Sequence, residues 1–165
     1  MLQVVKDDLN VAMNIKEAEL TDIETLFDIR TSVVENHQSR EEIAQLGITP
    51  ETVAQMLQTD CCAWIAEIDG KPVAFSIANA TEKTIFGVFV LPSFEGRGAG
   101  RALMEAAEIW LFSQGIEEIW LLTGNDSKLR AYGFYLHLGW ITVGVVTDGE
   151  MEGEMKFIKN KSIVF

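Results

Sequence analysis

Three glycines at alternate positions, Gly96, Gly98 and Gly100, stand where an apolar segment gives way to a helical pattern. Glycine lets the backbone come close to a ligand and adopts positive φ without a Cβ penalty. The first N–H groups of a helix have no partner within that helix, and they attract anions. Arg97 and Arg101 would add directed cationic contacts. The stretch therefore predicts a phosphate-binding turn; the alternative is a turn that only connects a strand to a helix.

The segments on both sides of this turn read as a buried strand and an amphipathic helix. Residues 85–91 are apolar except at Gly87, which favours a strand covered on both faces, and Pro92 ends it. Apolar residues then recur at helical spacing as far as Gly115. Another buried strand is expected over residues 118–123. A strand, a helix and a strand in this order predict a parallel pair with a right-handed crossover.

Two common nucleotide motifs do not fit the glycine turn. A dinucleotide-binding fingerprint that begins at Gly96 needs a glycine where this chain has Arg101. A nucleoside-triphosphate loop needs Gly-Lys followed by Ser or Thr, and the sequence contains no such triplet. Both interpretations are excluded.

The turn resembles motif A of the GNAT superfamily of N-acetyltransferases. In that motif Val-x-Pro is followed, at the start of a helix, by Gln or Arg, two residues, Gly, one residue and Gly or Ala. The chain has Val90-Leu91-Pro92 and then Glu95-Gly96-Arg97-Gly98-Ala99-Gly100. It departs from the family at Glu95, although glycine spacing preserves the backbone amides that hold pyrophosphate in the family.

A second stretch, residues 128–140, is similar to the family's motif B, Asn-x-x-Ala-x-x-x-Tyr-x-x-x-Gly-Phe. The matching positions are Ala131, Tyr135, Gly139 and the aromatic Trp140, while Lys128 replaces the asparagine. Two motifs in the right order are far more specific than one. The resemblance covers about residues 12 to 160, which we expect to form a single domain after a loose N-terminal end at residues 1–11.

The resemblance implies an α/β fold of the GNAT type. Its mixed sheet is mostly antiparallel, with one splayed parallel strand pair, and is flanked by helices. It implies transfer of an acetyl group from acetyl-CoA to a primary amine by direct attack in a ternary complex. A non-catalytic acyl-CoA-binding or regulatory module is the alternative, and a pure interaction domain is a third reading.

The resemblance also assigns roles to residues. Main-chain groups of Val88, Phe89 and Val90 would hold the pantetheine arm. The pyrophosphate would be held by the turn and the first helical residues, Gly96, Arg97, Gly98, Ala99, Gly100 and Arg101. Tyr135 matches the position of the general acid.

The acceptor side is less defined in sequence. Glu35 and Asn36 lie between two expected helices in the region that covers the acceptor in the family, so they are candidate substrate contacts. Some relatives that act on terminal amines carry a glutamate where this chain has Thr123. Water, Glu35 or Glu82 all remain open as the general base.

The amino-acid composition limits which kinds of partner the protein is expected to bind. A formal net charge of −12 over 165 residues argues against a nucleic-acid-binding face and favours a cationic or neutral small-molecule or peptide amine. The adjacent pair Cys61 and Cys62, without clustered histidines, predicts neither a disulfide framework nor a metal site. No apolar run approaches the roughly 20 residues of a membrane span, and no signal peptide is recognisable, so a cytoplasmic protein is expected. A homodimer remains open.

Turn and cap patterns locate the remaining elements. Capping boxes are expected at residues 21–24 and 39–42, and Pro50 should open a helix. Asp69-Gly70 predicts a hairpin, and a second hairpin is expected between residues 141–146 and 155–159. The helix that carries Tyr135 has three candidate N-caps, Asn125, Asp126 and Ser127.

Overall fold

The computed structural model describes residues 12–35 and 37–162. Its strands are β1 (Met13–Glu17), β2 (Cys61–Ile68), β3 (Lys71–Asn79), β4 (Thr84–Val90), β5 (Glu118–Thr123), β6 (Ile141–Val145) and β7 (Met155–Asn160). Its helices are α2 (Ile23–Arg30), α3 (Arg40–Gln45), α4 (Pro50–Thr59), α5 (Ala99–Ser113) and α6 (Arg130–His137), with 3₁₀ turns η1 (Leu20–Asp22) and η2 (Pro92–Phe94). The expected loose end at residues 1–11 lies outside the described part.

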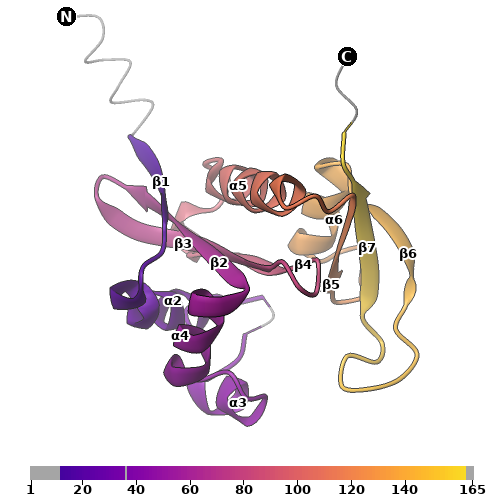
Figure 1. The fold of residues 1–165 in the computed structure, drawn as a ribbon, viewed down its shortest axis with the longest axis horizontal. Coiled ribbons are helices and arrows are strands. Elements are labelled where there is room, and N and C mark those ends of the chain that lie inside the picture. The colour runs from indigo at the N-terminus through magenta and orange to yellow at the C-terminus, as the bar shows by residue number, and fades with distance from the viewer. Residues whose placement is uncertain (1–11, 36, 163–165) are drawn as a thin grey trace, which may run out of the picture.

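The strands form one seven-stranded sheet in the order β1-β2-β3-β4-β5-β7-β6. Every neighbouring pair is antiparallel except β4 and β5, which are parallel. Helix α5 crosses one face of the sheet, and α2 and α4 pack on the other (Figure 1). The expected mixed α/β fold with one parallel pair is confirmed.

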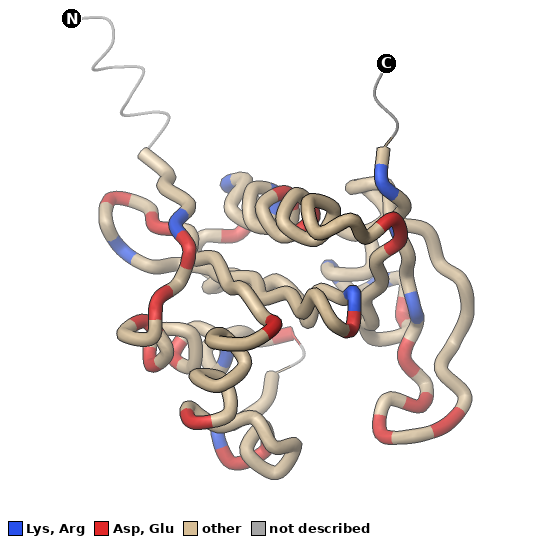
Figure 2. Tube along the Cα trace, viewed as in Figure 1, with Lys and Arg blue, Asp and Glu red and all other residues tan. Residues whose placement is uncertain are grey.

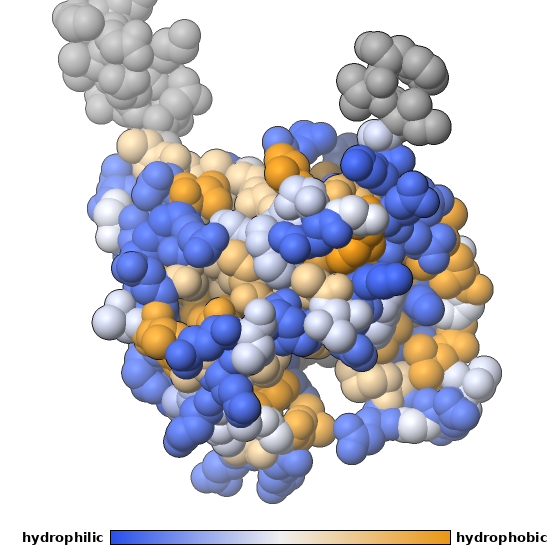
Figure 3. Space-filling model, viewed as in Figure 1, coloured by the Kyte–Doolittle hydropathy of each residue, from blue (hydrophilic) through white to orange (hydrophobic). Residues whose placement is uncertain are grey.

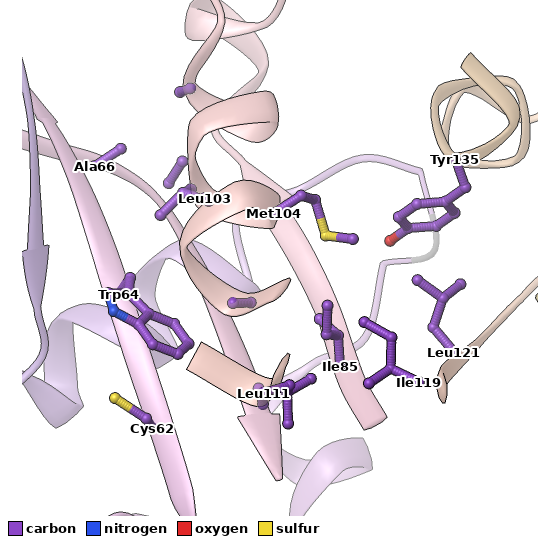
Figure 4. Close-up of a cluster of buried hydrophobic side chains, with 14 of the residues drawn as sticks. Cys62, Trp64, Ala66, Ile85, Leu103, Met104, Leu111, Ile119, Leu121 and Tyr135 are labelled. Carbon is purple, nitrogen blue, oxygen red and sulfur yellow. The ribbon is translucent and has the colours of Figure 1, made fainter. Parts of the chain in front are cut away.

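Strand β2 supplies both layers of the core. Its alternate side chains Cys61, Ala63 and Ile65 join the cluster under α2 and α4. Cys62, Trp64 and Ala66 join the cluster under α5, where Figure 4 shows Trp64 and Cys62 beside Leu111. The two cysteines therefore lie on opposite faces, as the alternation of a strand requires, and both are buried.

The short turns agree with the sequence at three places. Asp69 and Gly70 both have positive φ, 53° and 76°, and they join β2 to β3. The Ser39 hydroxyl accepts a hydrogen bond from the Glu42 N–H at 3.1 Å, while Glu42 accepts from the Ser39 N–H at 3.0 Å. Pro50 is the first residue of α4.

Two expected caps are wrong. The turn η1 precedes α2 and begins at Leu20, and the Asp22 carboxylate accepts from the Glu19 N–H at 2.8 Å, so the box at 21–24 is displaced. Helix α6 begins only at Arg130, and its N-cap residue, Leu129, has no side chain that can accept. Asp126 instead closes the preceding loop by accepting from the Lys128 N–H at 2.9 Å. Both errors arise because Thr, Asp and Asn serve turns as well as helix starts.

Strand β6 lies at an edge of the sheet and is exposed at all five residues. Its pairing with β7 shifts between Thr142 and Gly144, and Gly144 has a φ of 147°. The loop that joins the two strands carries much of the acidic charge in this half of the molecule (Figure 2). Its acids are Asp148, Glu150, Glu152 and Glu154.

Candidate active site

The parallel strands β4 and β5 meet at a single pair of residues. Thr84 pairs with Trp120, and the Thr84 hydroxyl donates a hydrogen bond to the Trp120 carbonyl at 2.6 Å. The Trp120 N–H donates to the Lys83 carbonyl at 3.1 Å. Beyond this point the strands diverge, so within the described residues the rest of β4 has a strand partner only in β3. The expected splay is confirmed.

A cleft of about 680 Å³ opens where the strands diverge. Its walls come from β4, the glycine turn, the start of α5, the inner face of α6 and the loop after α2. Eight of the expected cofactor-binding residues line it: Val88, Phe89, Val90, Gly96, Gly98, Ala99, Gly100 and Arg101. Arg97 is not among the lining residues; its guanidinium carbon lies 5.1 Å from the centre of the Phe94 ring.

The glycine turn fits an anion. Gly96 and Gly98 have φ of 78° and 89°, and a Cβ at either would meet no atom within 4 Å. Gly98 is the N-cap of α5 and supplies no side-chain acceptor to the first N–H groups of that helix. These donors and the positive end of the helix dipole suit the pyrophosphate of a coenzyme A thioester.

Gly100 is required for a different reason. A Cβ at this position would lie 3.2 Å from the Phe134 ring and 3.7 Å from a Val90 methyl. Glycine here lets α5 approach both α6 and β4 closely. The alternating glycines thus serve two purposes, backbone conformation at the first two and packing at the third.

Tyr135 projects from α6 into the core, and Figure 4 shows its hydroxyl on the side of Met104 and Leu121. The side chain is 4% exposed, and its ring packs against Trp140 and Phe157, with centres 6.3 and 5.8 Å away. Burial raises the pKa of Tyr135 to about 12, and a hydrogen bond with the Val88 backbone acts in the opposite direction. The phenol is therefore protonated at neutral pH, beside β4 and at the wall of the cleft.

The two candidate acceptor contacts differ in outcome. Asn36 lies outside the described residues. Glu35 lines the cleft, but its carboxylate accepts hydrogen bonds from the N–H groups of Arg130 and Ala131 at 3.2 and 3.4 Å. Glu82, considered as a base, lies in the turn before β4 and does not line the cleft, whereas Thr123 does.

Sequence reasoning missed three further residues that line the cleft from α6, namely Arg130, Phe134 and His137. The Arg130 Nε lies 3.6 Å from a Glu95 carboxylate oxygen, so the unusual acid of the glycine turn is paired with α6. Ala131 and Tyr135 are four residues apart and share one face of α6. Arg130 and Phe134, each one residue earlier, would have been expected next to them on that face. That face, rather than Tyr135 alone, forms the wall opposite the glycine turn.

The described residues contain no cluster of three His, Cys, Asp or Glu side chains that could hold a metal ion. They also include no helix long and apolar enough to cross a membrane. On the face shown in Figure 3, hydrophilic and hydrophobic residues are interspersed, with a gap between the α2–α4 region and the β6–β7 loop.

Comparison with solved structures finds the same fold in several acetyltransferases. A PaiA N-acetyltransferase from Thermoplasma acidophilum, solved in complex with coenzyme A, is 18% identical, with a TM-score of 0.74 over 91% of this chain and 99% of that one. The Escherichia coli ribosomal-protein-S18-alanine N-acetyltransferase is 20% identical, with a TM-score of 0.67 over 93% and 100%. Ard1 from Thermoplasma volcanium is 19% identical, with a TM-score of 0.69 over 91% and 98%.

A search of curated protein sequences found no match. The model of the acetyltransferase (GNAT) family matches residues 20–140, which include the glycine turn, both diverging strands and Tyr135. The cleft and its glycine turn are the parts of this fold that suit the donor. The chain therefore belongs to the GNAT family of acetyltransferases and is an N-acetyltransferase that uses acetyl-CoA.

Proposed function

We propose that the protein transfers the acetyl group of acetyl-CoA to a primary amine by direct attack, with both substrates in the cleft between β4 and β5. The observation that carries this proposal is the single-residue joint between those strands at Thr84 and Trp120. Within the described residues, this short pairing leaves the rest of the β4 backbone without a partner strand on the β5 side. The cleft that opens there is lined by both the glycine turn and Tyr135.

The donor end of the proposed complex uses backbone groups. The main chain of Val88, Phe89 and Val90 would pair with the amide-bearing pantetheine arm, as a strand would. The pyrophosphate would accept from the N–H groups after Gly98, with Arg101 close by. Each charge-assisted bond contributes about 1.5–3 kcal/mol and the helix dipole about 0.3–1 kcal/mol. These local donors would offset the net charge of −12, because distant charges are screened beyond about 8–10 Å.

The reaction joins the amine nitrogen to the acetyl carbon and breaks the carbon–sulfur bond. An alkyl amine with a pKa near 10.4 is neutral in only about one molecule in a thousand at pH 7, so it must lose a proton first. The two carboxylates that line the cleft, Glu35 and Glu95, are each engaged with α6. We therefore assign proton removal to water in the cleft rather than to either of them.

Tyr135 would assist departure of the sulfur. A thiol has a pKa near 8.5, whereas burial raises the pKa of Tyr135 to about 12. Complete proton transfer from the phenol to the thiolate would be unfavourable, because the buried phenol holds its proton more tightly than a thiol does. The hydroxyl would instead donate a hydrogen bond to the sulfur as charge develops there, and the thiolate would take its proton from solvent.

Calorimetric titration with acetyl-CoA, with NAD as the control ligand, tests the donor site first. Selective acetyl-CoA binding, followed by release of free CoA with an amine from a panel, is the expected result. The panel contains a polyamine, an amino sugar, an amino acid and a lysine peptide, because the charge and the cleft admit each of them. Binding without CoA release in any mixture would support a non-catalytic acyl-CoA-binding module instead.

A further inference from the structure

We propose that Glu35 is a positioning residue that holds the N-terminal end of α6, and through it Tyr135, across the mouth of the cleft. The effect on acetyl transfer rests on the proposed function, whereas the effect on α6 does not. Glu35 was a candidate for substrate contact or proton removal, and its geometry points to another role.

The Glu35 carboxylate lies where a helix cap would. One oxygen accepts from the Arg130 N–H at 3.2 Å and the other from the Ala131 N–H at 3.4 Å. These are the first two residues of α6. A negative charge at a helix N-terminus is favourable because it satisfies free N–H groups and opposes the helix dipole. The acid comes from a loop 95 residues earlier in the chain.

Helix α6 has little stability of its own and needs such support. It has eight residues, fewer than a helix needs for independent stability, and it contains Gly133. Its own N-cap position is Leu129, which has no acceptor, and Tyr135 is its only buried residue. The orientation of Tyr135 therefore depends on tertiary contacts, both at the start of the helix and in the core, where its ring packs against Trp140 and Phe157.

Two loops converge on Arg130. Glu35, from the loop after α2, contacts its backbone, while Glu95, from the glycine turn, contacts its side chain at 3.6 Å. Both acids line the cleft. The acceptor-side loop and the donor-side turn thus both contact the first residue of the helix that carries Tyr135. Because both Glu35 oxygens accept from α6, we assign this side chain to ordering the site rather than to taking the proton of the amine.

Amide hydrogen exchange of the protein without substrate tests the contact itself. Glu35→Ala is expected to lower protection of the Arg130 and Ala131 amides by about 2- to 30-fold, the range that loss of a helix cap produces. Protection in α5 should stay unchanged. Glu41→Ala is the matched control, because Glu41 is an exposed acid on the neighbouring α3. Equal exchange at Arg130 and Ala131 in Glu35→Ala and the native protein would overturn the proposal.

Steady-state kinetics distinguish a positioning role of Glu35 from a role as the general base. Glu35→Ala should lower kcat by about 2- to 30-fold, in step with the lost cap, while acetyl-CoA affinity changes little. Glu35→Gln keeps one oxygen that can accept from one of the two N–H groups, so it should recover part of the lost kcat and keep the same pH profile. A glutamine variant as slow as the alanine variant, with the acidic limb of the profile lost, would overturn the proposal and make Glu35 the base. If the native protein transfers no acetyl group, the proposed function fails, while hydrogen exchange still decides the contact.

Discussion

The two sides of the cleft are built differently. On one side, β2 and β3 are buried along most of their length, between α5 on one face and α2 and α4 on the other. On the other side, β6 is exposed throughout, β5 alternates between buried and more exposed residues, and β7 has one buried residue, Phe157. Apolar packing on both faces holds the first half of the sheet. The second half is packed on one face, where Ile119, Leu121 and Phe157 join the cluster under α5, and it needs further contacts.

Polar contacts supply part of that need. The Glu108 carboxylate on α5 accepts from the Trp140 indole at 3.1 Å and from the Lys159 ammonium at 2.8 Å. Lys159 also donates to the Leu138 carbonyl at the end of α6. One acid therefore joins α5 to β7 and, through Lys159, to α6. The comparison teaches that this cleft lies between a half packed on both faces and a half packed on one face and held in addition by a few directed contacts.

The largest effect is expected on acetyl-CoA affinity, from a change in the glycine turn. Gly98→Val should weaken acetyl-CoA binding by about 100-fold or more, because it disturbs a positive-φ turn whose N–H groups would make charge-assisted bonds of about 1.5–3 kcal/mol each to the pyrophosphate. Gly115→Val is the matched control, since Gly115 has a similar φ of 86° and equally open space at the other end of α5. Equal losses of affinity by titration in both variants would mean that strain, not the anion site, is responsible.

The half packed on both faces should respond most in stability. Leu103→Ala removes a fully buried side chain between α5 and the sheet, so we expect it to lower the free energy of unfolding by about 2–5 kcal/mol. Val143→Ala on the exposed β6 should change it by less than about 0.5 kcal/mol. Denaturant unfolding measures both. Similar losses would contradict the contrast between the halves.

The polar attachment should have an intermediate effect. Glu108→Gln leaves one acceptor for two donors, and we expect a loss of about 1.5–3 kcal/mol in the free energy of unfolding. Glu105→Gln, one turn earlier on α5 and exposed, is the control and should have almost no effect. The tryptophan emission of the protein, to which Trp140 contributes, should shift in the first variant only. If Glu108→Gln changed neither the free energy of unfolding nor the emission spectrum, these hydrogen bonds would not contribute to holding β7 against α5.

The smallest effect is a pH dependence carried by Tyr135. Its folded pKa of about 12 lies above the value of 10.0 expected without burial, so the unfolded chain loses this proton first as pH rises. Tyr135 therefore does not change stability below about pH 10, and its ionisation lowers the stability of the fold as the pH rises from about 10 to about 12. Tyr135→Phe should abolish this part of the pH dependence of unfolding. An identical alkaline profile in the variant would show that Tyr135 ionises as freely in the fold as outside it.

Sequence reasoning succeeded where information is local. The glycine spacing, the Asp69-Gly70 turn and the alternation of Cys61 and Cys62 each follow from neighbouring residues and the geometry of one element. The splayed strand pair was predicted from the resemblance of two motifs to the GNAT family, because that resemblance implies the fold of the whole family.

It did less well where a contact joins distant residues. Glu35 reaches α6 across 95 positions, and Glu108 reaches Trp140 and Lys159 across 32 and 51. No period or motif marks such pairs, because only the tertiary fold brings them together. The local candidates Asn125, Asp126 and Ser127 were more conspicuous, yet none caps α6, since the loop uses the Asp126 side chain for its own turn.

The exposed edge of β6 also bears on how copies of the protein behave at high concentration. Ile141, Val143 and Val145 present apolar side chains on a strand at the end of the sheet, which is the kind of surface on which strands of another molecule can add. The shift in pairing at Gly144 interrupts the regular ladder, and the acids of the adjoining loop repel a second copy. Colloidal stability at this edge therefore depends on charge repulsion, and added salt, which screens that repulsion, should weaken the protection first.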